Sequence, residues 1–171
     1  MPGAIQPGPS RITLAEGTTL FVSARDGNVY PEEGHGLFVR DTRLLSRYRL
    51  RLGRRRWLLV GSASLSHYSA QAHFVNPAAN SPSGMIPRGM VALVWERTVR
   101  GGVHEDISIT NYSSQAVHFP LVLDAACDFA DLFELRRIGA ARRRRLRIDV
   151  HSAGIPEIRW WYERDRKSTR L

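Results

Sequence analysis

Acidic side chains gather in one segment of the sequence, LDAACDFADLFELRR, which carries Asp124, Asp128, Asp131 and Glu134. Two carboxyl groups held roughly 5 to 10 Å apart can hydrolyse a glycosidic bond, one as the acid and the other as the base or nucleophile. Here two of the four fall at the end of an expected strand and two in a connecting turn, close to many arginines. Surface ion pairs, each worth about 0–1 kcal/mol, are the more common outcome of such a pattern. We therefore predict no catalytic residue in this segment.

A second polar group lies in HGLFVRDTRLLSRYRLRL, residues 35–52, and consists of Arg40, Asp41 and Arg43, which precede the alternating strand. Guanidinium and carboxylate groups in one cluster can hold a polar ligand such as a sugar hydroxyl or a phosphate. The alternative is an Asp-Thr turn, in which the carboxylate caps backbone N–H groups and pairs with a neighbouring arginine. Taken alone, these residues favour the turn, within a loop that leads into a strand.

Motifs for metal binding and for nucleophilic catalysis are missing from the sequence. The six histidines form no H-x-x-x-H or H-E-x-x-H pair, and no G-x-S-x-G stands out. The single cysteine, Cys127, excludes an internal disulfide and a cysteine-clustered zinc site. We expect its thiol to be buried and inert. The prediction is no metal site and no cofactor.

The positive charge of the chain raises the question of a polyanionic partner. The formal net charge is +9, but all but one of the 25 Lys+Arg residues are arginine, a skew that GC-rich coding explains. The run ARRRRLRI, residues 141–148, is the best argument for nucleic acid. It lacks the interleaved aromatic residues that stack on bases, so a basic loop before a strand is favoured. Nucleic acid is thus a disfavoured partner, kept as an alternative.

The elements that must position these side chains alternate with period two. In SRYRLRL, Tyr48, Leu50 and Leu52 share one face and the intervening arginines face the other way. Similar segments are RWLLVG (56–61), 67–75, 90–99, 103–110, 116–130, 145–150 and 157–163. Only ADLFELRRIG, residues 130–139, suggests a helical turn, and residues 76–84 a long loop. Eight to ten antiparallel strands predict an all-β fold, an antiparallel β-sandwich.

The ends of the chain are expected to lie outside this domain. Residues 1–10 are predicted to be disordered, and residues 11–164 to form one domain. The last seven residues, DRKSTRL (165–171), hold the single lysine and match one reading frame of a sequencing adapter. We interpret them as an adapter artefact, the alternative being a genuine polar C-terminus. With no signal peptide and no run of about 18 apolar residues, the expected location is the cytoplasm, without a membrane partner.

Several segments together resemble one family. They are FVSARDGNV, HGLFVRDTRLLSRYRLRL, IPRGMVALVWERTV, ISITNYSSQAVHFPLVL and DFADLFELR. Their order is similar to that in the N-terminal domain of bacterial glycogen-debranching-type (amylo-α-1,6-glucosidase-like) proteins, from about Leu14 to Arg137. The resemblance implies a supersandwich-like β-sandwich of the type that precedes an (α/α)6 toroid in several glycoside hydrolases, where the toroid carries the catalytic carboxylates.

The resemblance also implies a role and candidate residues. The chain lacks sequence for a toroid and is expected to be a non-catalytic fragment, truncated within the last strands of the sandwich. Its implied partner is the toroid of the same chain, whose channel it would shape in carbohydrate metabolism, with an α-glucan as a candidate ligand. The residues implied in inter-domain docking or sugar contact are His35, Arg40, Asp41, Arg43, Asp128 and Asp131.

Overall fold

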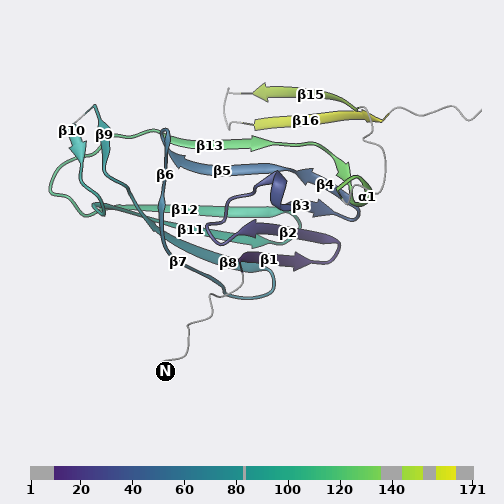
Figure 1. Cartoon of the computed structure of the whole chain (residues 1–171), viewed down its shortest axis with the longest axis horizontal. Helices are drawn as coiled ribbons and strands as arrows, with labels where there is room; N and C mark the ends of the chain where they lie inside the picture. Colours follow the sequence, from purple (N-terminus) through teal and green to yellow (C-terminus); the bar gives the residue numbers. More distant parts are fainter. Residues whose placement is uncertain (1–9, 83, 136–143, 152–156, 165–171) are drawn as a thin grey trace, which may run out of the picture.

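The computed structural model describes residues 10–82, 84–135, 144–151 and 157–164. It is built almost entirely of antiparallel strands arranged in layers (Figure 1). The predictions for residues 1–9 and for the segment 165–171 lie outside the described residues. Among the described residues, no helix is long and apolar enough to span a membrane.

One layer is a four-stranded sheet in the order β12-β11-β8-β7. Its strands are β7 (Leu58–Ser64), β8 (Ser69–Val75), β11 (Val91–Val99) and β12 (Val103–Asn111). Along β11 the inward side chains Val91, Leu93 and Trp95 are buried, while those between them are partly or fully exposed. This alternation places one face of the sheet on the core.

The opposing layer consists of two sheets. A five-stranded sheet has the order β1-β2-β3-β4-β14, and a three-stranded sheet has the order β13-β5-β6. The strands of the first are β1 (Arg11–Glu16), β2 (Thr19–Ala24), β3 (Gly36–Val39), β4 (Thr42–Leu45) and β14 (Ala130–Asp131). Those of the second are β5 (Arg47–Leu52), β6 (Arg55–Arg56) and β13 (Leu121–Ala126). An isolated bridge between Val29 and Tyr48 links the two sheets.

Two short helices and two hairpins complete the described part of the chain. The 3-10 helix η1 (Pro31–Glu33) connects β2 to β3, and the helix α1 (Leu132–Leu135) follows β14. Two further hairpins are β9 (Ala79–Ser81) with β10 (Gly84–Ile86), and β15 (Arg144–His151) with β16 (Glu157–Arg164).

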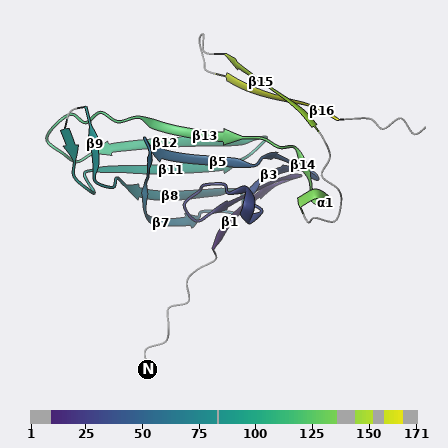
Figure 2. The same cartoon turned by 45° about the horizontal axis from the view of Figure 1, so that its top comes forward.

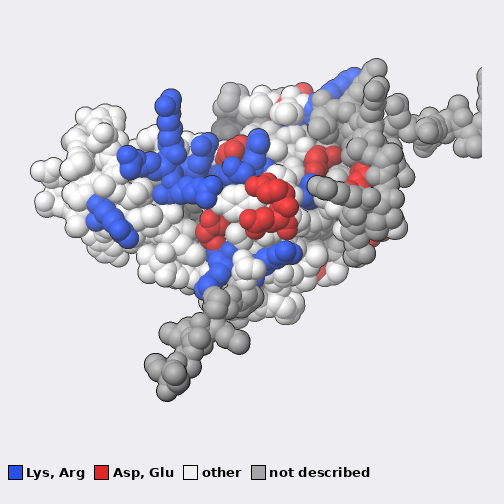
Figure 3. Space-filling view, viewed as in Figure 1, with Lys and Arg blue, Asp and Glu red and all other residues white. Residues whose placement is uncertain are grey.

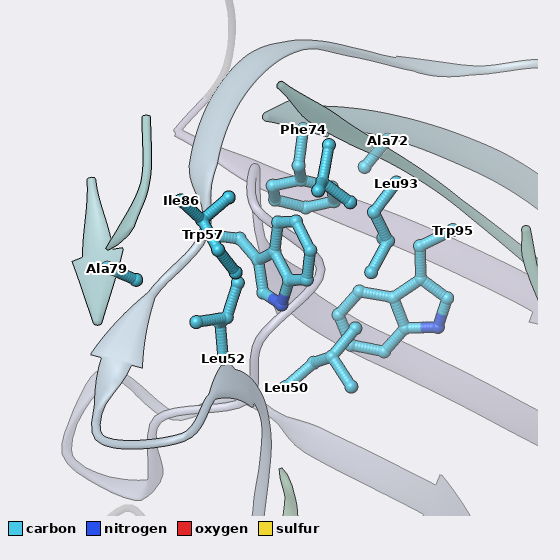
Figure 4. Close-up of a cluster of buried hydrophobic side chains, with 10 residues drawn as sticks. Leu50, Leu52, Trp57, Ala72, Phe74, Ala79, Ile86, Leu93 and Trp95 are labelled. Atoms are coloured by element: carbon cyan, nitrogen blue, oxygen red, sulfur yellow. The ribbon is translucent and has the colours of Figure 1, made fainter. Parts of the chain in front are cut away.

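The larger hydrophobic core lies between the two layers (Figure 4). Its buried members are Leu50, Leu52, Trp57, Ala72, Phe74, Ala79, Ile86, Val91, Leu93 and Trp95. Figure 4 shows Trp57 and Trp95 entering the same space, with Leu50 and Leu52 on one side and Phe74 on the other. Side chains from both layers therefore interdigitate, as in a β-sandwich. A second cluster, around Leu14, Phe21, Val29, Ala70 and Val99, lies under β1 and β2.

The predicted all-β antiparallel sandwich is confirmed, as are the helical turn at α1 and the two strands expected at residues 145–150 and 157–163, which are β15 and β16. One local prediction near β5 was wrong. The segment expected to be a loop before β5 is the β3–β4 hairpin, whose turn is Arg40–Asp41. The hairpin expected where the chain turns after β5 does form, but it is short, because β6 holds only two residues and β7 then joins the other layer.

The predicted long loop at residues 76–84 was also wrong, because it contains β9. The buried amide of Asn76 explains this order. Its Nδ2 donates to the carbonyls of Pro77 and Pro87, and its Oδ1 accepts from the N–H of Val91. A buried amide that uses both ends ties the β9–β10 hairpin to the start of β11.

Candidate functional site

Arg43 stands at the centre of the candidate site. It is buried, although it lies on the short strand β4 near the end of the sandwich. Its Nε donates to Asp128 Oδ1 at 3.2 Å, and its Nη2 contacts Asp128 Oδ2. Its Nη1 donates to the backbone carbonyls of His35, at 3.2 Å, and Pro31, at 3.4 Å. The guanidinium thus holds a bidentate carboxylate and two carbonyls, and joins η1, β4 and the segment before β14.

Gly36 makes room for this arginine. A Cβ on Gly36 would lie 2.6 Å from Arg43 Cδ and 2.8 Å from the carbonyl oxygen of Leu45. The aliphatic stem of Arg43 therefore crosses β3 where only a glycine fits. This requirement explains the glycine beside His35 in the segment HGLFVRDTR.

His35 is fully buried against η1. Its Nδ1 accepts from the N–H of Tyr30 at 3.4 Å, and its Nε2 lies 3.4 Å from Glu33 Oε2. This arrangement corresponds to a neutral ring with the proton on Nε2. Burial lowers the pKa of His35 below its ordinary value of 6.5, and this effect outweighs the opposing effect of the Glu33 carboxylate.

Asp131 begins α1 and takes part in a reciprocal cap. Its Oδ1 accepts from the N–H of Glu134 at 2.8 Å, and Glu134 Oε2 accepts from the N–H of Asp131 at 3.0 Å. This is the geometry of a capping box. Through β14, Asp131 pairs with Thr42 on β4, so the capped turn lies against the Arg43 strand.

Arg40 and Asp41 form the exposed tip of the β3–β4 hairpin. Arg40 has a positive φ of 54°, and its N–H donates to the Thr18 carbonyl at 2.9 Å. The Asp41 carbonyl accepts from the N–H of Leu132 at 3.1 Å. Backbone bonds therefore fix the tip while both charged side chains reach solvent. The turn interpretation paired the Asp41 carboxylate with a neighbouring arginine, whereas the carboxylate that binds Arg43 is that of Asp128, 85 residues away.

The six residues predicted from the sequence thus lie at one end of the sandwich, where they have different structural roles. The buried His35 and Arg43 form a connected network with the partly exposed Asp128, Asp131 caps α1, and only Arg40 and Asp41 present free-standing polar heads. The carboxylates of Asp128 and Asp131 already accept hydrogen bonds, which suits architecture better than proton transfer. No three His, Cys, Asp or Glu side chains of the described part of the chain gather as a metal site would require.

Comparison with known protein families shows which family the chain belongs to. Residues 14–171 match the family model of the N-terminal domain of (some) glycogen debranching enzymes. The chain belongs to this family. Searches of curated proteins and of solved structures give no match. The match covers every strand after β1 and the second half of β1, so the sandwich is the debranching-enzyme N-terminal domain.

Sequence reasoning missed one charged residue of this debranching-enzyme domain. Arg97 is buried on the inward face of β11, where its Nε donates to Glu105 Oε1 at 2.5 Å and its Nη1 to the Gly27 carbonyl at 2.9 Å. Its guanidinium lies 4.1 Å from the ring centroid of Phe21 and 4.5 Å from that of Trp95. The signal was present, because Arg97 shares the parity of Trp95 in VWERTV.

Cys127 directly precedes the carboxylate that holds Arg43 and is half-buried. Burial, with a smaller contribution from the Asp128 carboxylate, raises the pKa of its thiol to about 11. The thiol is therefore protonated at neutral pH and a poor nucleophile. This agrees with the expectation of an inert cysteine, although the side chain is not fully buried.

Arginines also mark the outer face of the three-stranded sheet. Figure 3 shows basic side chains gathered over β5 and β6, with an acidic group beside them near η1. The strand residues are Arg47, Arg49, Arg51, Arg55 and Arg56, and Arg54 lies in the turn between the strands. Acidic neighbours balance part of this charge, since Arg47 Nε lies 3.4 Å from Asp124 Oδ1 and Arg49 Nη2 4.0 Å from Glu32 Oε1.

Proposed function

We propose that this domain is a non-catalytic module that docks on an (α/α)6 catalytic domain of the same protein and helps to shape its α-glucan channel. The observation that supports the docking surface is the construction of the β3–β4 end. A network of the buried His35 and Arg43 with the partly exposed Asp128 ties that end together, and the tip of the β3–β4 hairpin projects Arg40 and Asp41 from it. Polar heads on a rigid scaffold lose little conformational freedom on binding.

A neighbouring apolar side chain supports the same surface. Phe133 of α1 is exposed, and the backbone of α1 is tied to the hairpin tip by the bond from Leu132 to Asp41. A large apolar group beside two charged ones is a common composition for the centre of a protein interface. In this proposal Arg40, Asp41 and Phe133 contact the catalytic domain, and Arg43, Asp128 and Asp131 position them.

The test requires the downstream gene sequence, recovered by resequencing the source DNA across the codon for Arg164. A catalytic domain encoded there would be expressed separately and titrated with this domain by calorimetry. We expect the double change Arg40→Ala and Asp41→Ala to weaken association by about tenfold, a loss of about 1.4 kcal/mol. Arg88→Ala is the matched control, because Arg88 is exposed in the loop after β10, at the other end of the sandwich (Figure 1). Equal losses for both variants would contradict docking through the hairpin tip.

The arginines of β5 and β6 favour a second candidate function, the binding of a polyanion. Three of them project from one face of β5 at every second residue, which matches a row of negative charges. Part of the arginine run at residues 142–145, on which this alternative first rested, lies outside the described residues. Binding of a DNA oligonucleotide at low salt, lost steeply as salt rises, would support it. The triple change of Arg47, Arg49 and Arg51 to Gln should then reduce the salt slope, and no binding at low salt would eliminate it.

A further inference from the structure

The sandwich has one open side, between the edge strands β12 and β13. β12 is the last strand of the four-stranded sheet, and β13 the last strand of the three-stranded sheet. Four large apolar side chains on these two strands are 37% to 51% exposed, namely Ile107, Ile109, Leu121 and Leu123. We call these four residues the seam.

The register shows that the seam residues belong to the core faces of their sheets. Ile107 and Ile109 pair with Trp95 and Leu93 of β11. Likewise Leu121 and Leu123 pair with Leu52 and Leu50 of β5. Directly paired residues point to the same side of a sheet, and all four partners are buried core residues. The seam is therefore core surface that is open to solvent, and not the outer face of the sandwich.

The seam continues toward the Arg97 end of the molecule. An open hollow of about 260 Å³ lies there, beside the first residues of β12. It is lined by Phe21, Leu37, Leu45, Tyr48, Val103 and Glu105. Val103 pairs with Val99 and shares the parity of Ile107, so this hollow opens on the same face of β12 as the seam, with the ion-paired Glu105 between them.

The hairpin of β15 and β16 carries a matching apolar face. Ile148 pairs with Trp160 and Val150 with Ile158, so these four side chains share one face. Three of them, Ile148, Val150 and Ile158, are 49% to 67% exposed. The other face carries Arg147, Asp149 and Arg159. Such a hairpin is amphipathic, with period two.

We propose that the apolar face of the β15–β16 hairpin packs against the seam and covers the core between β12 and β13. A two-stranded hairpin is at best marginally stable by itself in water, so its apolar face needs a partner surface. Exposed edge strands with apolar faces are likewise a liability that proteins cover. The same chain supplies both halves of this contact.

The length and position of the hairpin fit this occupant. Strands β15 and β16 each have eight residues, against nine in β12 and six in β13. Eight residues, 136–143, separate α1 from β15 in the sequence, and a chain of eight residues spans at most about 26–29 Å. Figures 1 and 2 both place the hairpin on the β13 side of the sandwich, and Figure 2 shows it standing off that side. Packing on the seam requires the hairpin to approach β13 and β12 from where it stands.

Chemical cross-linking tests the contact between the hairpin and the seam directly. In a Cys127→Ser background, we would combine Ile109→Cys on the seam with Ile148→Cys on the hairpin and treat the protein with a short bismaleimide. The expected product is an intramolecular cross-link, identified by mass spectrometry of the digested monomer. The matched control pairs Ile109→Cys with Asp149→Cys, on the opposite hairpin face, and should cross-link several-fold less. Equal cross-linking yields for the two cysteine pairs would overturn the proposal. Cross-links that form only between molecules would also overturn it, and would assign the seam to a second copy of the chain.

A second measurement does not depend on cysteine chemistry. The double change Ile148→Asp and Val150→Asp should release the hairpin and expose the seam, so binding of a hydrophobic fluorescent dye should rise above that of the unmodified protein. If the hairpin instead stands free, the same change removes exposed apolar surface, and dye binding should fall. Arg147→Asp on the opposite face should leave it unchanged. If dye binding to the double variant falls or does not change, the proposal is overturned. This result is independent of whether the tip of the β3–β4 hairpin docks on a catalytic domain.

Discussion

Arg43 shows how a single side chain organises the β3–β4 end of this domain. Its bonds to Asp128, Pro31 and His35 connect three segments that are distant in sequence or separated by a turn. A buried guanidinium is tolerated only when its donors are used and its charge is paired. The network therefore depends on both members of the Arg43–Asp128 pair being present.

We predict that Arg43→Ala lowers the free energy of unfolding by about 3 kcal/mol, because it removes the guanidinium that pairs with the Asp128 carboxylate and donates to two carbonyls. Chemical denaturation of the two proteins measures the difference. Arg40→Ala is the control, since Arg40 is exposed and should change stability by less than about 0.5 kcal/mol. Similar losses in both variants would contradict a central role for the Arg43 network.

His35 should make stability depend on pH. Burial lowers its pKa in the folded domain below 6.5, although Glu33, Asp26 and Glu32 oppose this and Arg11 assists it. The unfolded chain then binds a proton that the folded domain resists, so stability present above pH 6.5 is lost as the pH falls through that value. We expect the unfolding midpoint of a His35→Gln variant to vary less between about pH 7.5 and 5.5 than that of the unmodified domain. Parallel pH profiles would show that His35 is not the titrating group.

At the scale of elements, the β3–β4 hairpin illustrates a contact that pattern alone does not reveal. Alternation correctly predicted the half-buried strand β5 but assigned residues 35–45 to a loop. Two four-residue strands, joined by a charged tip and offset by a bulge between Leu37 and Phe38, are too short and irregular for a period-two signal. Their stability comes from pairing with β2 and β14, which are set by the tertiary fold.

A substitution at Gly36 tests how closely Arg43 packs against the β3–β4 hairpin. Gly36→Ala should destabilise the domain by about 1–3 kcal/mol, because the new Cβ would overlap Arg43 Cδ and the Leu45 carbonyl. Thermal or urea unfolding gives the value. In the matched control, Gly61→Ala on β7, nothing lies within 4 Å of the added Cβ, so no such loss is expected. If both substitutions are tolerated equally, the close crossing of β3 by Arg43 is not tight in solution.

At the scale of the whole molecule, the two layers are joined by apolar packing and by one buried ionic group. Arg97 on β11 holds Glu105 on β12, while Tyr48 on β5 donates its hydroxyl to the same carboxylate at 2.5 Å. Burial and the Glu105 carboxylate raise the pKa of Tyr48, so its hydroxyl stays a donor. This contact couples β5 of one layer to β11 and β12 of the other.

We predict that Arg97→Lys destabilises both layers together, by about 2–4 kcal/mol, because an ammonium group cannot replace the planar fork that reaches Glu105 and Gly27. Far-ultraviolet circular dichroism and tryptophan fluorescence should report the same lowered midpoint, as expected for one cooperative unit. The control is Arg100→Lys, at an exposed position, for which we expect no change in the unfolding midpoint. Separate midpoints for the two probes would show that the layers unfold independently.

The sequence by itself determined the fold class, the family and the faces of most strands. Alternation is a local property of extended backbone, so Leu50 and Leu52 could be placed on one face of their strand, and Ala72 and Phe74 on one face of theirs, without knowing their neighbours. Tertiary structure decided which strands became neighbours. The pairing of Arg43 with Asp128 and the open seam at Ile109 both depend on sheet order and on layer packing. Those choices are made between segments far apart in the chain, where the period of a single strand carries no information.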